Sequence, residues 1–133
     1  MEAQERTGAL ADVSRELVRL HSEYYGKGPT RAKAYMVDDT LVCLLEGGFT
    51  TVERTLIDEG EADAVHDIRR SFQQAMEGEF TKVVESATQR KVIAYMSQIH
   101  HDPDLAVEVF VLEPAEHPVV DRHEVVLEEA GRE

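Results

Sequence analysis

Two pairs of short segments with alternating apolar side chains, each pair joined by a tight turn, constrain the fold of this chain most. Residues 31–37 and 40–46 flank Asp38 and Asp39, and residues 91–100 and 105–112 flank a four-residue turn, 101–104. Alternation with a period of two is typical of strands, and Asp and Pro are common turn residues. The sequence therefore predicts two β-hairpins.

Three other segments carry apolar residues at the spacings of three and four that indicate helices. Residues 9–24 are followed by Gly26, which suits a helix cap, and Thr50 with Glu53 is the capping-box signature of a short helix reaching about Asp58. Residues 61–86 predict a long helix, with Gly78 as a kink or break. The element order αββααββ predicts an α+β fold, in which a four-stranded antiparallel sheet from two hairpins carries the long helix on one face.

The length of 133 residues fits one domain, which we expect to span residues 1–112. Residues 113–133 contain seven acidic side chains against two arginines and predict a mobile acidic tail. The apolar runs 41–45 and 92–96 fall short of the roughly 20 residues that cross a bilayer, and no signal sequence opens the chain. We therefore expect a cytoplasmic protein without direct membrane insertion.

Charge and cysteine content exclude further classes. The formal net charge of -13 repels phosphate backbones, so the sequence argues against a nucleic-acid partner. The single cysteine, Cys43, lies within an apolar strand and is expected to pack in the core.

The hairpins predict two apolar faces on one sheet. In the first hairpin one face collects Ala32, Ala34, Met36, Leu41, Cys43 and Leu45. In the second, one face collects Val92, Ala94, Met96, Val107, Val109 and Val111, and it is predicted to lie under the long helix, with Phe72 and Met96 as core residues. The opposite face would then hold Tyr35, Val37, Val42, Leu44, Ile93, Tyr95, Ile99, Phe110 and Leu112.

That opposite face is too apolar to leave in water, so something must cover it. One prediction is a homodimer whose contact includes Tyr35, Val42, Tyr95 and Phe110. The alternative is that the first helix of the same chain provides the cover.

Several short motifs are similar to those of a known family. They are the run Tyr-Gly-Lys-Gly-Pro-Thr at residues 25–30, Val37-Asp38-Asp39, Leu45-Glu46-Gly47, Thr55-Leu56, Ile68-Arg69-Arg70 and Arg90-Lys91-Val92. Over residues 10–112 the chain resembles the MpsC-like family of bacterial domains, labelled as part of a Na⁺-translocating, membrane-potential-generating system. Gln89 stands where the family pattern leads us to expect glycine. The resemblance implies a soluble accessory of a membrane transport system.

A loop and several basic residues raise the alternative of a small-anion or nucleotide-binding protein, or even an enzyme, that uses residues 26–31. The candidate ligand-binding residues are Lys27, Thr30, Arg31, Arg69 and Arg90. Backbone NH groups and positive charge can hold a phosphate, but the spacing does not match a P-loop. A helix cap followed by a proline-stiffened strand entry explains both glycines without a ligand.

No other motif supports catalysis, a cofactor or a metal. His100, His101, Asp102 and Asp104 crowd one turn, but adjacent strand residues point to opposite sides and make a poor chelate. The sequence contains no nucleophile elbow, HExxH zinc-binding helix, CxxC pair or Rossmann glycine pattern. The first hypothesis is therefore a noncatalytic interaction module, with no assigned catalytic residue, metal or cofactor.

Overall fold

The computed structural model describes residues 2–115 and 123–128, and the side chains of residues 8–115. Its helices are α1 (Glu2–Tyr25), α2 (Thr51–Asp58) and α3 (Ala62–Thr88). Its strands are β1 (Arg31–Val37), β2 (Thr40–Glu46), β3 (Val92–His100), β4 (Leu105–Leu112) and β5 (His123–Glu128). The predicted α+β order is confirmed from α1 to β4.

The helices begin and end at the capping residues that the sequence predicts, apart from the cap of α3. Gly26 follows α1 with a φ of 93°, a value that glycine adopts freely. The Thr50 side chain accepts from the Glu53 backbone while the Glu53 side chain accepts from the Thr50 backbone, so the predicted capping box forms at α2. Helix α3 runs through Gly78 without a break and ends at Gln89, which has a left-handed φ of 59°.

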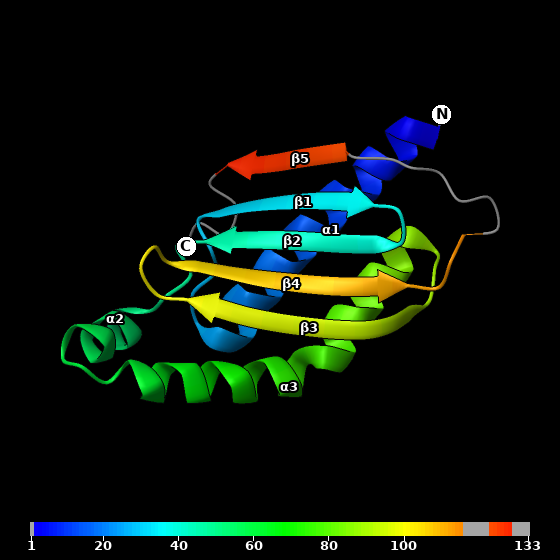
Figure 1. Cartoon of the computed structure of the whole chain (residues 1–133). Coiled ribbons are helices and arrows are strands. Elements are labelled where there is room, and N and C mark those ends of the chain that lie inside the picture. The colour runs from blue at the N-terminus through cyan, green and yellow to red at the C-terminus, as the bar shows by residue number, and fades with distance from the viewer. Residues whose placement is uncertain (1, 116–122, 129–133) are drawn as a thin grey trace.

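The strands form one sheet in the order β3-β4-β2-β1-β5 (Figure 1). All four pairings are antiparallel, and both hairpins have the predicted register, with Met36 opposite Leu41 and Met96 opposite Val109. The two hairpins meet through β2 and β4, where Cys43 pairs with Glu108. Strand β5 pairs with β1 and extends the sheet on that side. It lies within residues 113–133, which were predicted as an acidic tail, and no strand was predicted there.

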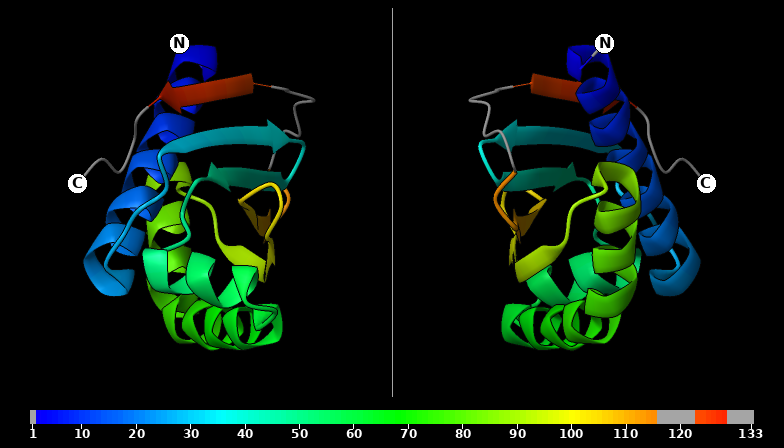
Figure 2. Two further views of the ribbon diagram at one scale, coloured as in Figure 1. Left: turned by 90° about the vertical axis from the view of Figure 1, so that its left-hand side faces the viewer. Right: turned by 90° about the vertical axis from the view of Figure 1, so that its right-hand side faces the viewer.

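Helices α1 and α3 lie on the same side of the sheet (Figure 2). Helix α1 packs on β1, β5 and α3, while α3 packs on β3 and α1. The helices cover only part of the predicted second face. Its residues Phe110 and Leu112 from the second hairpin are buried beneath α1 and α3, so the alternative in which the first helix provides cover holds in part there. Its first-hairpin residues Tyr35 and Val42 lie on the opposite side of the sheet, which no described helix covers.

The core fills the space between the two helices and the sheet. Its members include Leu10, Val13, Leu17, Ala32, Ala34, Leu41, Cys43, Met76, Phe80, Val84, Phe110 and Leu112. The predicted inner face of the first hairpin is confirmed, because Ala32, Ala34, Met36, Leu41, Cys43 and Leu45 are all buried. Phe72 is half-buried and packs against this core.

The predicted inner face of the second hairpin is wrong for most of its residues. Met96 is 54% exposed, and Phe110 and Leu112 take the buried positions under the helices. The cause is the non-local pairing of β4 with β2, which aligns Phe110 with Leu41. Val92 still packs against the core because the β3 ladder is irregular between Val92 and Ala94.

Candidate functional site

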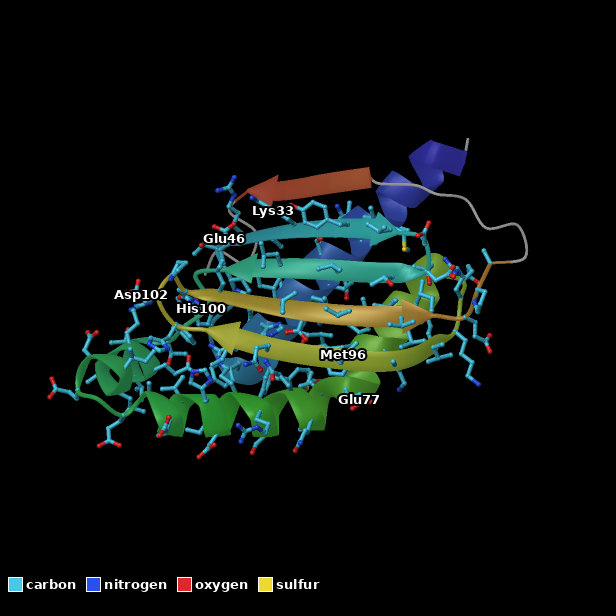
Figure 3. All side chains as sticks on the ribbon, viewed as in Figure 1. Lys33, Glu46, Glu77, Met96, His100 and Asp102 are labelled. Atoms are coloured by element: carbon cyan, nitrogen blue, oxygen red, sulfur yellow. The ribbon has the colours of Figure 1, made fainter. Side chains whose placement is uncertain are left out.

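The sheet face that points away from the helices carries a group of partly exposed apolar side chains. Adjacent rows run across four strands, and the two central rows are Tyr35, Val42, Val109 and Met96, then Lys33, Leu44, Val107 and Gln98. Figure 3 looks onto this face and shows Met96 on it, with Lys33 and Glu46 at the end where β2 finishes. We call this surface the open face.

Within β1 to β4, charge on the open face is confined to one end. Lys33 lies 3.9 Å from Glu46 and Arg31 lies 4.0 Å from the same carboxylate, so these charges partly satisfy one another. Across these four strands the row of Tyr35, Val42, Val109 and Met96 contains no charged residue, and beyond Tyr35 the row continues to Glu124 at the β5 edge. A face of this kind can bury apolar area against a partner without stranding an unpaired charge.

Of the predicted interface residues, two lie on the open face and two do not. Tyr35 and Val42 pair with each other there and are partly exposed. Phe110 is fully buried under the helices, and the half-buried Tyr95 packs against the same core with its ring 5.1 Å from that of Phe110. The assignment of Tyr95 and Phe110 to the interface is therefore wrong, and Val109 and Met96 occupy the corresponding exposed positions.

Three of the predicted anion-binding residues lie together near the end of β2. The Lys27 Nζ donates to the Gly47 carbonyl at 2.5 Å, and the Thr30 hydroxyl donates to the Glu46 carbonyl at 3.3 Å. Arg31 neighbours the Glu46 carboxylate. Each group thus already faces an acceptor of its own chain.

The other two predicted anion-binding residues lie elsewhere. Arg69 is buried beside α2, whereas Arg90 lies at the opposite end of β2, where its guanidinium binds Asp39 at 2.5 Å and the Glu113 carbonyl at 2.6 Å. The five residues therefore do not form one site.

Arg69 is the centre of a buried polar network. Its guanidinium donates to both oxygens of Glu53 at 2.7 Å and to the Gly48 carbonyl at 2.8 Å, and it stacks over the Tyr25 ring at 4.1 Å. The Tyr25 hydroxyl also donates to Glu53. Burial alone would raise the pKa of Glu53, but the hydrogen bonds from Arg69, Tyr25 and the Thr50 backbone outweigh it and lower that pKa.

The turn between β3 and β4 is tied to this network. Asp104 accepts from the backbone NH groups of Gly48 and Phe49 at 3.2 and 3.1 Å, so it fills the position that an external anion would take in that loop. His101 instead lies against His66 of α3, with ring centroids 5.9 Å apart. Over residues 8–115, no three His, Cys, Asp or Glu side chains are arranged to hold a metal ion.

One notable group was not predicted from sequence. Glu108 is fully buried beneath the helices and accepts hydrogen bonds from Tyr95 at 2.5 Å and Ser97 at 2.9 Å. Burial raises its pKa to about 7 against the opposing effect of these hydrogen bonds. The pairing of Glu108 with the buried Cys43 shows that it points into the core, which no local pattern of the sequence indicates.

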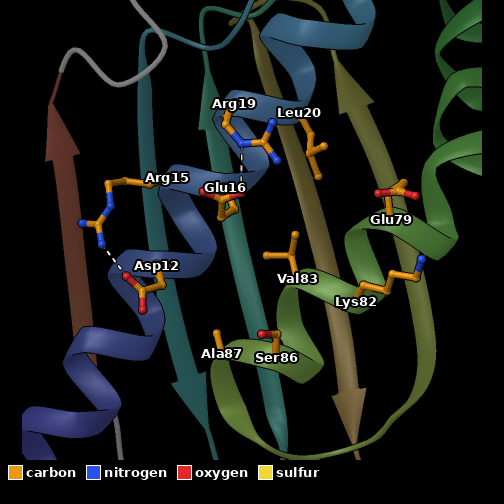
Figure 4. A pocket seen from close by; sticks show the side chains of 10 residues that line it. All are labelled: Asp12, Arg15, Glu16, Arg19, Leu20, Glu79, Lys82, Val83, Ser86 and Ala87. Carbon is orange, nitrogen blue, oxygen red and sulfur yellow. Dashed lines mark hydrogen bonds and ion pairs between the residues drawn. The ribbon is translucent and has the colours of Figure 1, made fainter.

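A groove between α1 and α3 has a volume of about 430 Å³ (Figure 4). Leu20, Val83 and Ala87 contribute apolar side chains. Charges of both signs surround them, and Arg15 and Arg19 are paired with acidic neighbours on α1 itself. The groove offers no convergent set of groups for a particular ligand.

The described residues form a small two-layer α+β domain, with helices on one side of the sheet and a mostly apolar, uncovered face on the other. No helix in the described ranges has the length and apolar composition needed to span a membrane. Residues 6–114 match the family model described as Na⁺-translocating membrane potential-generating system (MpsC), and the chain belongs to this family. No curated protein and no solved structure matches the chain.

Proposed function

We propose that this protein is a noncatalytic cytoplasmic interaction module that accompanies a membrane ion-transport system and works as a homodimer joined through the open face. The observation that carries the proposal is the uncharged row of Tyr35, Val42, Val109 and Met96 across four strands. The family description, a Na⁺-translocating membrane potential-generating system, supports the link to transport.

The size of the open face favours a protein partner. Strands lie about 4.8 Å apart and rise about 3.3 Å per residue, so four strands of seven residues cover roughly 450 Å² in projection. Apolar patches of this size on a soluble domain commonly mark protein contacts. Met96, at 54% exposed, would be among the first side chains to be buried.

Charge and symmetry favour a second copy as that partner. The formal net charge of -13 makes two copies repel each other unless they meet where charge is lowest, and the centre of the open face is such a place. Two identical sheets have the same twist and pack face to face at about -30°, and a two-fold axis brings the same patch against itself.

Light scattering at micromolar concentration tests the dimer. The wild type should have a mass of about twice 15.0 kDa, and Val42→Glu should yield monomers or aggregates because it buries an unpaired charge in the contact. The matched control is Val52→Glu, since Val52 is 69% exposed on α2, away from the open face. A wild-type mass near 15.0 kDa contradicts the dimer.

The link to transport is tested in cells. In sodium medium, a strain that lacks the gene should develop a smaller membrane potential than the wild-type strain, measured with a voltage-sensitive dye, and the difference should disappear in sodium-free medium. Wild-type protein and Val52→Glu should restore the potential, whereas Val42→Glu should not. An unchanged potential in the deletion strain argues against the accessory role.

A further inference from the structure

The core contains an acidic group whose only direct partners are neutral. Glu108 is 0% exposed, and the hydroxyls of Tyr95 and Ser97 are its two hydrogen-bond donors. Within residues 8–115 no lysine, arginine or histidine pairs with it. A carboxylate removed from water without a cation is costly, and such groups commonly take up a proton instead.

The groups that face Glu108 from each neighbouring element do not replace a cation. Strand β2 places the Cys43 thiol opposite it, and Ser14 of α1 acts on that thiol. Helix α3 contributes Arg69, which lowers the pKa of Glu108 through its charge but is committed to Glu53, and Glu77, whose charge acts on Tyr95. The Phe80 ring of α3 makes an edge contact with the Tyr95 ring, with the two ring centroids 6.2 Å apart.

We propose that Glu108 is a proton-binding site inside the core and that loss of its proton loosens the packing of α3 on the β3–β4 hairpin. The protonated acid is neutral and can both donate to and accept from the two hydroxyls. The carboxylate can only accept, so it holds both hydroxyls as donors and still lacks water or a cation. Tyr95 also packs against Phe80 of α3. The free-energy cost of burying the charged carboxylate should therefore weaken the contact between α3 and the hairpin.

The direction of the pH effect follows from the two states of Glu108. Its pKa is about 7 in the folded protein and about 4.5 as an ordinary carboxyl, so the folded state binds more protons between these values. The contribution of Glu108 to stability is therefore largest below the lower value. As pH rises between the two values, this group lowers the folding equilibrium constant by up to tenfold per pH unit, and its effect levels off above the upper value.

Infrared difference spectroscopy on the full chain tests the site directly. The wild type should show a carboxylic-acid carbonyl band that disappears with a midpoint near pH 7, and the band should be absent in Glu108→Gln. Tyr95→Phe removes a donor that lowers the pKa of Glu108, so the midpoint should move to higher pH. A merely structural role would not produce this shift, and a midpoint near 4.5 overturns the proposal.

Hydrogen exchange and denaturation test the consequence. After correction for intrinsic base catalysis, amides of α3 around Phe80 should exchange faster at pH 8 than at pH 6 in the wild type. Glu108→Gln should abolish that difference and the fall in the folding constant between pH 5 and 7, while exposed Glu79→Gln should retain both. Identical pH profiles for the wild type and Glu108→Gln overturn the proposal. The proposal goes beyond the interaction function, because it holds for monomer and dimer alike.

Discussion

Arg69 of α3 and Glu53 of α2 form a bidentate ion pair, with both nitrogen–oxygen distances at 2.7 Å and both side chains about 95% buried. The pair joins α2 to α3 beside the apolar cluster in which Leu56 and Ile57 of α2 pack around Val65 of α3. Through Gly48 it also holds the loop that follows β2. Removing one partner leaves the other charged and buried, which is the costly way to break such a pair.

Arg69→Met should therefore destabilise the domain by about 3 to 5 kcal/mol in chemical denaturation. Arg70→Met is the control, because Arg70 pairs with Asp67 on the exposed side of the same helix and should change stability by less than about 0.5 kcal/mol. The double variant Arg69→Met with Glu53→Leu should recover part of the loss. Equal effects at positions 69 and 70 would show that the pair is not buried in solution.

The lowered pKa of Glu53 predicts a loss of stability in acid. A carboxyl whose folded pKa is lowered contributes stability above its unfolded value near 4.5, and that contribution disappears as pH falls through the folded value. Glu53→Gln should flatten the decline of stability below pH 4.5. Glu108→Gln should leave that acid limb unchanged, because Glu108 is protonated there in both states. The measurement is urea denaturation between pH 3 and 5.

The reversed faces of the second hairpin predict opposite sensitivities at neighbouring strands. Phe110→Ala should cost about 3 to 5 kcal/mol, since a fully buried ring leaves a cavity in the core. Met96→Ala should cost less than about 1 kcal/mol in the monomer, because its side chain is largely exposed. Denaturation midpoints of the two variants decide between this orientation and the reverse.

Gln89 predicts a stabilising substitution. It holds the left-handed conformation at the end of α3, where glycine costs least and where the family pattern leads us to expect it. Gln89→Gly should stabilise the domain by about 0.5 to 1 kcal/mol. Gln74→Gly, on the exposed side of α3, should instead cost about 1 kcal/mol. A loss of stability at both positions would contradict the left-handed cap.

The scattered basic residues predict an absence of tight anion binding. Calorimetry with millimolar inorganic phosphate or ATP should give no binding heat, because Lys27 donates to Gly47 and Arg69 pairs with Glu53. If heat is observed and disappears in Lys27→Ala and Arg31→Ala folded variants, the anion-binding alternative regains its support.

Local signals account for what was predictable from sequence. The capping box at Thr50, the cap at Gly26 and both turn lengths depend on residues close in the chain, and each forms as predicted. The orientation of one hairpin against the other depends on the pairing of β2 with β4, to which no local pattern contributes. The burial of Glu108 could not be predicted from the local pattern either, because a charged residue in a strand normally lies on the solvent side.

The pairing of β2 with β4 also bears on how the chain folds. Leu41 and Phe110 are about 70 residues apart in sequence, whereas each hairpin closes a turn of two or four residues. Closing so long a loop costs conformational entropy, and the chain loses this entropy before the contacts between β2 and β4 can compensate for it. We expect the hairpins and helices to form early and their docking at β2 and β4 to limit the folding rate. Truncating buried side chains at the β2–β4 pairing, such as Leu41 and Phe110, should then slow folding, whereas truncating Met96 on the edge strand β3 should not.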